Sequence, residues 1–388
     1  MSLVKEIVAM EDELTRWRRD IHAHPELGFE ENRTAGFVAE KLSEFGMEVF
    51  TGIGKTGVVG VLKVGNETKA VGLRADMDAL PIEERNTFDH RSTQRGRMHA
   101  CGHDGHTTML LAAAKYLSET RNFRGQVNFI FQPAEEGIGG AKAMIEDGLF
   151  EQFPCDNLFA MHNAPGLPVG KFAAVPGTRT AAGAFFDITV VGKGAHGAFP
   201  DQGVDPILVA GQLIVALQSI VSRSTPPTET AVVSITQVQG GDAYNVIPAT
   251  AKLAGTVRTL SMPVMTQVEA KMNQIVDGVC AAHGAVAEID FRIIFHPVVN
   301  DAAASELAAI VCDDLVGEEN VYKTGKPGTG SEDFSYMAEV VPGCYLNLGN
   351  GQDSYPLHNH DYDFDDRALV YGASFFARLV ETSLSDEG

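Results

Sequence analysis

Short apolar runs alternate with helical patterns between residues 57 and 180 of the chain. Runs that are apolar throughout are typical of strands buried on both faces. The predicted strands are residues 57–64, 70–78, 125–132 and 156–162, and the predicted helices are residues 107–120 and 139–150. Buried strands that alternate with helices favour a mostly parallel sheet covered by helices on both faces. We therefore expect an α/β fold in this part of the chain.

The pattern changes between residues 183 and 293. Its order is strand, helix, strand, strand, helix, strand, at residues 184–194, 206–223, 231–241, 249–259, 265–284 and 285–294. This order is typical of the ferredoxin-like α+β arrangement. After it, a helix at 302–316, a strand at 343–349 and a helix at 367–384 return to the first style. The simplest arrangement is one α/β domain, formed by residues 1–182 and 294–388, with residues 183–293 inserted as a smaller domain.

Charge and cysteine content narrow the class of protein. The 388 residues carry a formal net charge of -21, which argues against nucleic acid or an anionic membrane as a partner. We find no apolar run that approaches the roughly 20 residues of a membrane span. The first 20 residues read as one amphipathic charged helix without a signal-peptide apolar region, so we expect a cytoplasmic protein. The five cysteines are scattered and odd in number, which favours a ligand or catalytic role over a disulfide framework.

Side chains that bind metals or transfer protons follow the predicted strands. In an open parallel sheet, ligands bind beyond the carboxyl ends of the strands. The residues found there are Asp76, Asp78, Glu135, Glu136, His162, His358 and His360, and Cys101 and His103 stand just before a predicted helix. This set exceeds the needs of one four-coordinate ion and suits two divalent metals bridged by a water. Of the adjacent Glu135 and Glu136, one can bind metal while the other takes the proton of the water.

These residues also admit other interpretations. Cys101 could be an inert buried thiol or the nucleophile of a Cys–His pair. The nucleophile interpretation leaves Glu135 and Glu136 without a purpose. His358 and His360 are two residues apart, so only one of them can face the metals if the segment is extended. The residues alone do not choose between them.

Nine segments carry a family resemblance, in order along nearly the whole chain. They are RADMDALP, HACGHDGHT, FQPAEEG, MHN, GKGAHGAFP, NVIP, GTVRT, GSEDFSY and LHNHDYDFDD. Together they resemble the M20-type metallo-amidohydrolases, in the branch of hippurate hydrolases, N-acyl-amino-acid amidohydrolases and indole-acetyl-amino-acid hydrolases. The resemblance implies a zinc-peptidase-like catalytic domain with an inserted ferredoxin-like lid, through which a homodimer forms. It also implies hydrolysis of the amide bond of a small N-acyl amino acid.

The resemblance implies two divalent metal ions and assigns their ligands. The ligands would be Cys101, His103, Glu136, His162 and His358, with Cys101 in the bridging position. Zinc or manganese suits these donors best, and cobalt or nickel also fits. Glu135 would be the general base. Related branches carry His-x-Asp where this chain has Asp76 and Asp78, so Asp78 would orient a ligand.

On the lid, the resemblance implies three further roles. His196 would steady the oxyanion in a neighbouring active site, and Asn245 and Arg258 would bind the substrate carboxylate. The alternatives are a loop cap for His196, a turn for Asn245 and a surface ion pair for Arg258. Two other functions stay open for the whole chain: a dipeptidase or aminopeptidase of the same superfamily, and a non-catalytic binding protein that keeps the fold.

Overall fold

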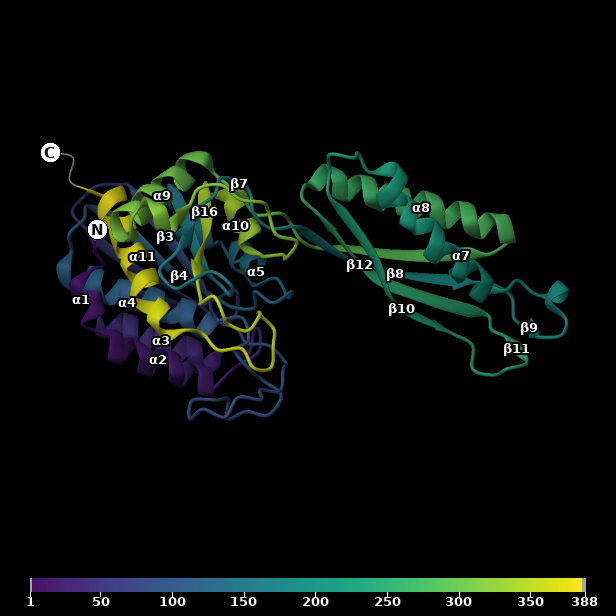
Figure 1. The fold of residues 1–388 in the computed structure, drawn as a ribbon, viewed down its shortest axis with the longest axis horizontal. Coiled ribbons are helices and arrows are strands. Elements are labelled where there is room, and N and C mark those ends of the chain that lie inside the picture. Colours follow the sequence, from purple (N-terminus) through teal and green to yellow (C-terminus); the bar gives the residue numbers. More distant parts are fainter. Residues whose placement is uncertain (1, 386–388) are drawn as a thin grey trace. The chain divides into compact units, whose positions relative to one another are not determined.

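The computed structural model describes residues 2–385, which form two compact units (Figure 1). The first unit contains the residues up to Arg179, Val298–Lys326 and the residues from Asp333 onward. The second contains Thr180–Pro297 and Pro327–Glu332. The catalytic and lid roles of these parts of the chain stay predictions.

An eight-stranded sheet, counted over the described residues, is the centre of the first unit. Its order is β1 (Glu48–Ile53), β2 (Gly57–Val64), β4 (Gly125–Gln132), β3 (Ala70–Asp76), β5 (Asn157–Ala164), β16 (Gly343–Gly349), β6 (Phe172–Ala173) and β15 (Val321–Tyr322). The central strands β4, β3, β5 and β16 are parallel, so their carboxyl ends meet at one edge. Strand β2 runs antiparallel to β4. An apolar run predicts a buried strand but not its direction.

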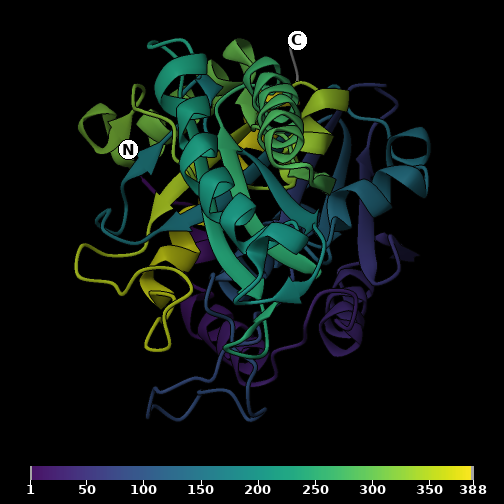
Figure 2. The same ribbon diagram turned by 90° about the vertical axis from the view of Figure 1, so that its right-hand side faces the viewer.

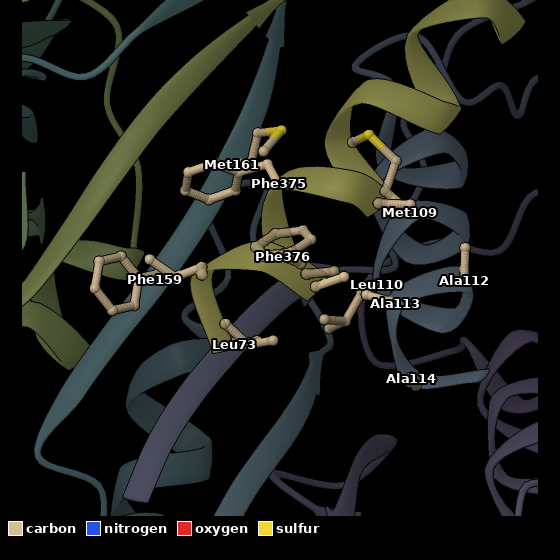
Figure 3. Packing of buried hydrophobic residues seen from close by; sticks show 14 of the residues in the cluster. Leu73, Met109, Leu110, Ala112, Ala113, Ala114, Phe159, Met161, Phe375 and Phe376 are labelled. Carbon is tan, nitrogen blue, oxygen red and sulfur yellow. The ribbon is translucent and has the colours of Figure 1, made fainter. Parts of the chain in front are cut away.

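Helices cover both faces of this sheet. Successive residues of a strand point to opposite faces, so each central strand packs against both sets of helices. They are α4 (His103–Thr120), α9 (Ala302–Val316) and α11 (Leu369–Ser383) on one face, and α5 (Gly140–Glu146), α6 (Leu149–Gln152) and α10 (Phe334–Val340) on the other. In β4, Phe129 packs with the first set and Ile130 with the second. Figure 3 shows Phe375 and Phe376 of α11 between α4 and β5.

The N-terminal segment is broken where the sequence predicted one continuous helix. Helix α1 (Lys5–Val8) ends before α2 (Glu11–Ala23) begins. Helix α3 (Asn32–Glu44) and strand β1 follow, and the pattern of the sequence did not reveal them. The predicted helix over 139–150 is likewise two helices, because Gly148 adopts a left-handed φ of 84° between α5 and α6.

The second unit has the β-α-β-β-α-β order that the sequence predicted. Its elements are β8 (Ala182–Val191), α7 (Pro206–Ser219), β10 (Ala231–Gly240), β12 (Thr250–Thr259), α8 (Met262–His283) and β13 (Val286–Phe295). The strands form an antiparallel sheet in the order β10-β12-β8-β13. Helices α7 and α8 lie side by side on one face of it (Figure 1 and Figure 2). This arrangement is ferredoxin-like.

Helix α7 corrects one expectation from the sequence. With the π-helical turn η2 (Ile220–Ser224) it forms an apolar helix over Pro206–Ser224, whose length and composition would allow it to cross a membrane. Its 19 residues approach the roughly 20 of a membrane span, contrary to the expectation that no run does so. Only 28% of the helix is buried inside the structure. One such helix is weak evidence for a membrane span, because a helix of a soluble protein can meet the same criterion.

The remaining elements are two-residue strands and three-residue 3-10 helices. They are β7 (Gly177–Thr178), β9 (Ala195–His196), β11 (Val246–Ile247), β14 (Val299–Asn300), η1 (Pro200–Gln202), η3 (Glu318–Asn320) and η4 (Asp366–Ala368). In the second unit β9 pairs with β11, and this ladder places His196 opposite Val246.

Candidate metal centre

The predicted ligands come from separate segments at one edge of the large sheet. Strand β4 ends at Gln132 and is followed by Glu135 and Glu136, while His162 lies near the end of β5. Cys101 lies two residues before His103, the first residue of α4. His358 follows β16 in a loop. The edge is the one where the carboxyl ends of the parallel strands meet.

These segments bring potential ligand atoms together in three overlapping groups. The groups are Cys101, His103 and His162; Cys101, Glu136 and His358; and His103, Glu135 and Glu136. Within each group the ligand atoms lie within 4.8 Å of one another. The structure therefore gathers all five predicted metal ligands and the predicted base. Cys101, His103 and Glu136 each belong to two of the three groups, so the groups overlap at these residues.

Hydrogen bonds turn two imidazoles so that one ring nitrogen of each remains available. His103 donates from Nδ1 to the Asp78 carbonyl oxygen at 2.8 Å, with Asp78 Oδ1 at 3.2 Å. Its buried Nε2 makes no hydrogen bond among the described residues. His162 donates from Nδ1 to the Asn163 carbonyl at 2.7 Å, which leaves Nε2 3.4 Å from Cys101 Sγ. Fixing the proton on Nδ1 is how proteins prepare Nε2 for a metal.

Burial and charge act differently on the two imidazoles. Burial and the neighbouring His106 hold the pKa of His162 well below its usual value, so His162 is neutral and can donate a lone pair. Burial also opposes protonation of His103, but the Asp76 carboxylate and the hydrogen bond to Asp78 raise its pKa to about 10. A metal at His103 must therefore displace a proton.

Cys101 lacks the electrostatic environment of a catalytic nucleophile. Burial, and then the carboxylates of Glu136 and Glu135, hold the pKa of its thiol well above the usual value. An activated cysteine needs the opposite, a positive environment that lowers the pKa. A divalent cation among these groups would supply that positive charge and favour the thiolate. The donor set therefore fits a metal better than it fits a Cys–His nucleophile pair.

Asp78 ties two of the metal-binding segments together. Besides accepting from His103, its Oδ2 accepts the Glu136 backbone N–H at 3.0 Å. Asp78 is buried, with 1% of its side chain exposed. Its place matches the orienting role that the sequence predicted. The neighbouring Asp76 is held by Arg74 and His106, each at 2.6 Å.

The structure separates His358 from His360. His358 Nε2 lies 3.2 Å from Glu136 Oε1, and this contact with the carboxylate raises the pKa of His358. Its backbone, at φ 62°, donates to the Ala100 carbonyl at 2.8 Å. His360 instead donates from Nδ1 to the Glu83 carbonyl at 2.7 Å. The geometry therefore favours His358 as the ligand.

The three predicted residues of the lid lie in the second unit. His196 is exposed, and its Nδ1 accepts the Ala198 backbone N–H at 3.1 Å. Asn245 is also exposed, and its carbonyl accepts from the Gly197 backbone at 2.7 Å. Arg258 is half-buried and bonds Thr256 and the Val257 carbonyl. None of the three belongs to the metal-ligand groups found among the described residues.

Comparisons with known proteins decide the family. The profile of peptidase family M20/M25/M40 matches residues 72–382. Hippurate hydrolase of Campylobacter jejuni is 46% identical over 98% of this chain and 99% of its own length. N-acetylcysteine deacetylase of Bacillus subtilis is 38% identical over 96% of this chain and 97% of its own length. The crystal structure of the Bacillus subtilis YXEP protein, described as a dinuclear metal binding peptidase from the M20 family, covers 97% of this chain and 99% of its own, at 34% identity and a TM-score of 0.85.

The chain belongs to peptidase family M20. This confirms the resemblance carried by the nine sequence segments. It is an amidohydrolase of that family, and its structure has residue groups fit to bind metal. The individual ligand assignments stay predictions.

The motifs did not reveal a buried charged network beside the M20 metal-ligand groups. Arg18 is fully buried and bonds Asp363 and Asp366 at 2.8 and 2.7 Å. His22, one helical turn further along α2, donates to Asp104 at 2.8 Å and lies 3.2 Å from Glu84. The spacing of Arg18 and His22, which puts both on one face of a helix, was the available signal.

Sequence reasoning also missed two polar residues among the predicted ligands. Asn163 follows His162 directly, and Tyr362 lies four residues after His358. Both are buried and hydrogen-bonded to each other at 2.8 Å. Both lie inside segments that carry the family resemblance, MHN and LHNHDYDFDD, and this was the signal in the sequence.

Proposed function

We propose that this M20 amidohydrolase cleaves the amide bond of small N-acyl amino acids, with release of a carboxylic acid and a free amino acid. Relatives named hippurate hydrolase and N-acetylcysteine deacetylase, similar over nearly the whole chain, support this substrate class. The observation that carries the proposal is the group of His103, Glu135 and Glu136. It places a carboxylate beside the candidate ligands, where proton transfer is needed.

Two divalent metal ions would be held by Cys101, His103, Glu136, His162 and His358. When bound, they would polarise the acyl carbonyl and lower the pKa of a bound water. Cys101 would be the shared ligand, as the family resemblance implies, and it belongs to two of the groups, as do His103 and Glu136. Zinc or manganese suits the mixture of thiolate, imidazole and carboxylate, and cobalt or nickel also fits.

Glu135 is the proposed general base. Its carboxylate accepts the proton released when the attacking water adds to the carbonyl carbon, and hands that proton to the amide nitrogen as the C–N bond breaks. The nitrogen must be protonated because an amide anion is a poor leaving group. Glu135 is buried, with 5% exposed, so water competes little for its carboxylate. Asp78 holds His103 and the Glu136 backbone in place for this step.

The residues of the second unit are assigned to substrate and oxyanion. The Ala198 N–H fixes the lone pair of His196 on Nδ1, so a neutral ring carries its proton on the exposed Nε2 and can donate to an oxyanion. We assign His196 to the active site of a second copy, in a homodimer formed through this unit. Asn245 and Arg258 are assigned to the substrate carboxylate, for which a planar guanidinium is well shaped. The cytoplasmic location stays a prediction.

The first experiment is a hydrolysis screen with zinc, manganese, cobalt or nickel added. Hippurate, N-acetyl-methionine and indole-acetyl-alanine are compared with dipeptides under the same conditions. We expect the N-acyl amino acids to be cleaved faster. Faster cleavage of dipeptides favours the dipeptidase or aminopeptidase alternative, and the absence of bound divalent ion after supplementation favours a non-catalytic binding protein.

Glu135→Gln tests the base separately from the metals. It keeps the shape of the side chain and removes its ability to accept a proton. We expect metal content to be unchanged and turnover to fall on the order of 1000-fold. Activity within about tenfold of the parent contradicts the role. Mixing Glu135→Gln chains with His196→Ala chains should restore some activity in hybrids, and confirmed hybrids without activity contradict the assignment of His196.

A further inference from the structure

We propose that Asn163 is a positioning residue that holds three metal-binding segments of the candidate centre in register. The inference rests on the proposed function, because it takes Cys101, His162 and His358 to be ligands. Asn163 is the residue after His162 at the end of β5, and 1% of its side chain is exposed. Nothing in its own chemistry binds metal strongly or transfers protons. Its possible contribution is therefore geometric.

All four polar groups of Asn163 have partners at the centre. Its Nδ2 donates to the Cys101 carbonyl at 2.6 Å, and its Oδ1 accepts from the Tyr362 hydroxyl at 2.8 Å. Its backbone N–H donates to His106 Nε2 at 3.0 Å. Its carbonyl accepts from Nδ1 of His162 at 2.7 Å. One residue thus touches the segments of Cys101 and His162 and the loop that follows β16.

The hydrogen bond from Tyr362 also connects Asn163 to the loop that carries His358. Tyr362 lies four residues after His358 in the same loop, and none of its side chain is exposed. The loop is fixed at its other end by the His358 N–H, which donates to the Ala100 carbonyl at 2.8 Å. Ala100 precedes Cys101, whose own carbonyl Asn163 holds. The His358 and Cys101 segments are therefore tied both directly and through Asn163.

Asn163 and Tyr362 pack closely against Gly102, the residue after Cys101. Gly102 has a left-handed φ of 91°, and a Cβ added there would lie 2.3 Å from Asn163 Nδ2 and 2.6 Å from the Tyr362 hydroxyl. The glycine lets the Cys101 segment turn while lying against the amide. The amide of Asn163 is therefore in direct contact with the backbone that carries Cys101.

His106 completes the support for His162. It donates from Nδ1 to Asp76 at 2.6 Å, so its Nε2 is the acceptor for the Asn163 N–H. The carbonyl of Asn163 in turn fixes the proton of His162 on Nδ1. Loss of the amide side chain leaves the Cys101 carbonyl and the Tyr362 hydroxyl without their partner in a buried place. Loss of such outer contacts costs roughly 10–100-fold in metal affinity in other proteins.

A matched pair of substitutions separates positioning from simple stability. Asn163→Ala removes the side-chain bonds at the centre. Asn128→Ala is its control, because Asn128 is fully buried and donates to the Phe153 and Pro154 carbonyls at 3.1 and 3.0 Å. Asn128 lies in β4 away from its carboxyl end and contacts no candidate ligand. Both changes lose buried hydrogen bonds, but only one loses them beside the candidate ligands.

A second pair removes a single hydroxyl. Tyr362→Phe deletes the bond to Asn163 Oδ1 and keeps the ring. Tyr116→Phe is its control, since the Tyr116 hydroxyl donates to Glu381 Oε1 at 2.8 Å and this ring is also buried. If Asn163→Ala does not fold, the tyrosine pair decides the question.

The experiment titrates metal-depleted, full-length protein with cobalt(II). Calorimetry gives the number and affinity of the bound ions, and the thiolate-to-cobalt absorption reports on Cys101. We expect roughly 10–100-fold weaker binding and a changed absorption for Asn163→Ala, a smaller loss for Tyr362→Phe, and parental binding for both controls. Partial recovery of turnover in Tyr362→Phe at high cobalt also supports the proposal.

The proposal and the proposed function fail differently. If Asn163→Ala and Tyr362→Phe bind cobalt as their controls do, Asn163 has no positioning role, whatever their melting temperatures. If the parent chain itself binds no divalent ion, the proposed function is overturned and this inference loses its premise. Equal weakening in all four variants also overturns the inference, since it would reflect general loss of stability.

Discussion

Two groups of buried polar side chains meet at the first turn of α4, and they differ in what their atoms bind. His103 belongs to the candidate metal centre and leaves Nε2 without a hydrogen bond among the described residues. His22 contacts the next residue of the helix, Asp104, and its two ring nitrogens lie 2.8 Å from Asp104 and 3.2 Å from Glu84. Both histidines are buried. At this turn, the buried histidine that lies among other potential ligands keeps one ring nitrogen without a hydrogen bond, whereas both ring nitrogens of His22 have carboxylate partners.

The candidate metal centre and the network around Arg18 also differ in the charges that surround them. In the metal-ligand groups, burial and then the nearby carboxylates of Glu136 and Glu135 raise the pKa of the Cys101 thiol. In the network around Arg18, the guanidinium lies among Asp104, Asp363 and Asp366. The first region offers several donors that could hold a metal ion, and in the second a guanidinium already lies among the carboxylates.

The largest expected effect comes from His103→Ala. It removes an imidazole whose Nε2 faces the other candidate ligands, so we expect turnover to fall on the order of 1000-fold, which corresponds to about 4 kcal/mol. Metal analysis should show loss of bound ion. His22→Gln should keep its metal and lose far less activity. Equal losses of bound metal and turnover in both variants would contradict the assignment of metal binding to the region of His103 alone.

Arg18→Met should give the next largest effect, on stability. It leaves Asp363 and Asp366 without the buried charge that they contact, and breaking such a pair costs about 3–5 kcal/mol. Denaturant unfolding measures this loss. The adjacent Arg19 also pairs with Asp366 but is half exposed, so Arg19→Met should cost less than about 1 kcal/mol. Similar losses for both arginines would contradict the network as described.

His22 should make stability depend on pH. Although burial opposes protonation, Asp104 and Glu84 raise the pKa of His22 to about 9 from its usual 6.5. The folded state therefore binds the proton more tightly, so the stabilisation is full below pH 6.5 and is lost as pH rises through 9. Protonated His22 thereby contributes about 3 kcal/mol to the free energy of unfolding.

Unfolding of the parent and of His22→Gln from pH 6 to 10 measures this contribution. The difference between the two unfolding free energies should shrink over that range. A difference that stays constant with pH would show that His22 contributes packing alone.

The smallest expected effect is that of His360→Ala. His360 is half-buried and its ring bonds the Glu83 carbonyl, away from the candidate ligands, so activity and metal content should change less than about twofold. His358→Ala, two residues away, should weaken metal binding strongly. The comparison is made by metal titration of both variants. A strong loss of metal affinity in His360→Ala would show that His360 binds the metal and would contradict the assignment of His358.

Much of the fold was predictable because apolar continuity marks buried elements. The strands at 57–64, 125–132 and 343–349 and the helix at 302–316 have in the structure the bounds that the sequence predicted. The breaks in the N-terminal helix and after Asp147 were not predicted, since they depend on local backbone angles. Two-residue strands such as β6 and β15 exist only through pairing with distant segments.

The sequence by itself determined which side chains form the candidate centre, because each follows an apolar strand or precedes a helix whose pattern is local. Only the tertiary structure decided which ring nitrogen is available, which of His358 and His360 lies at Glu136, and that Asn163 joins three segments. The physical reason is the distance along the chain between partners. Arg18 and Asp363 are 345 residues apart, and Asn163 and Tyr362 are 199 apart. A buried hydrogen bond selects its partner by place in the folded chain, and no local pattern records that place.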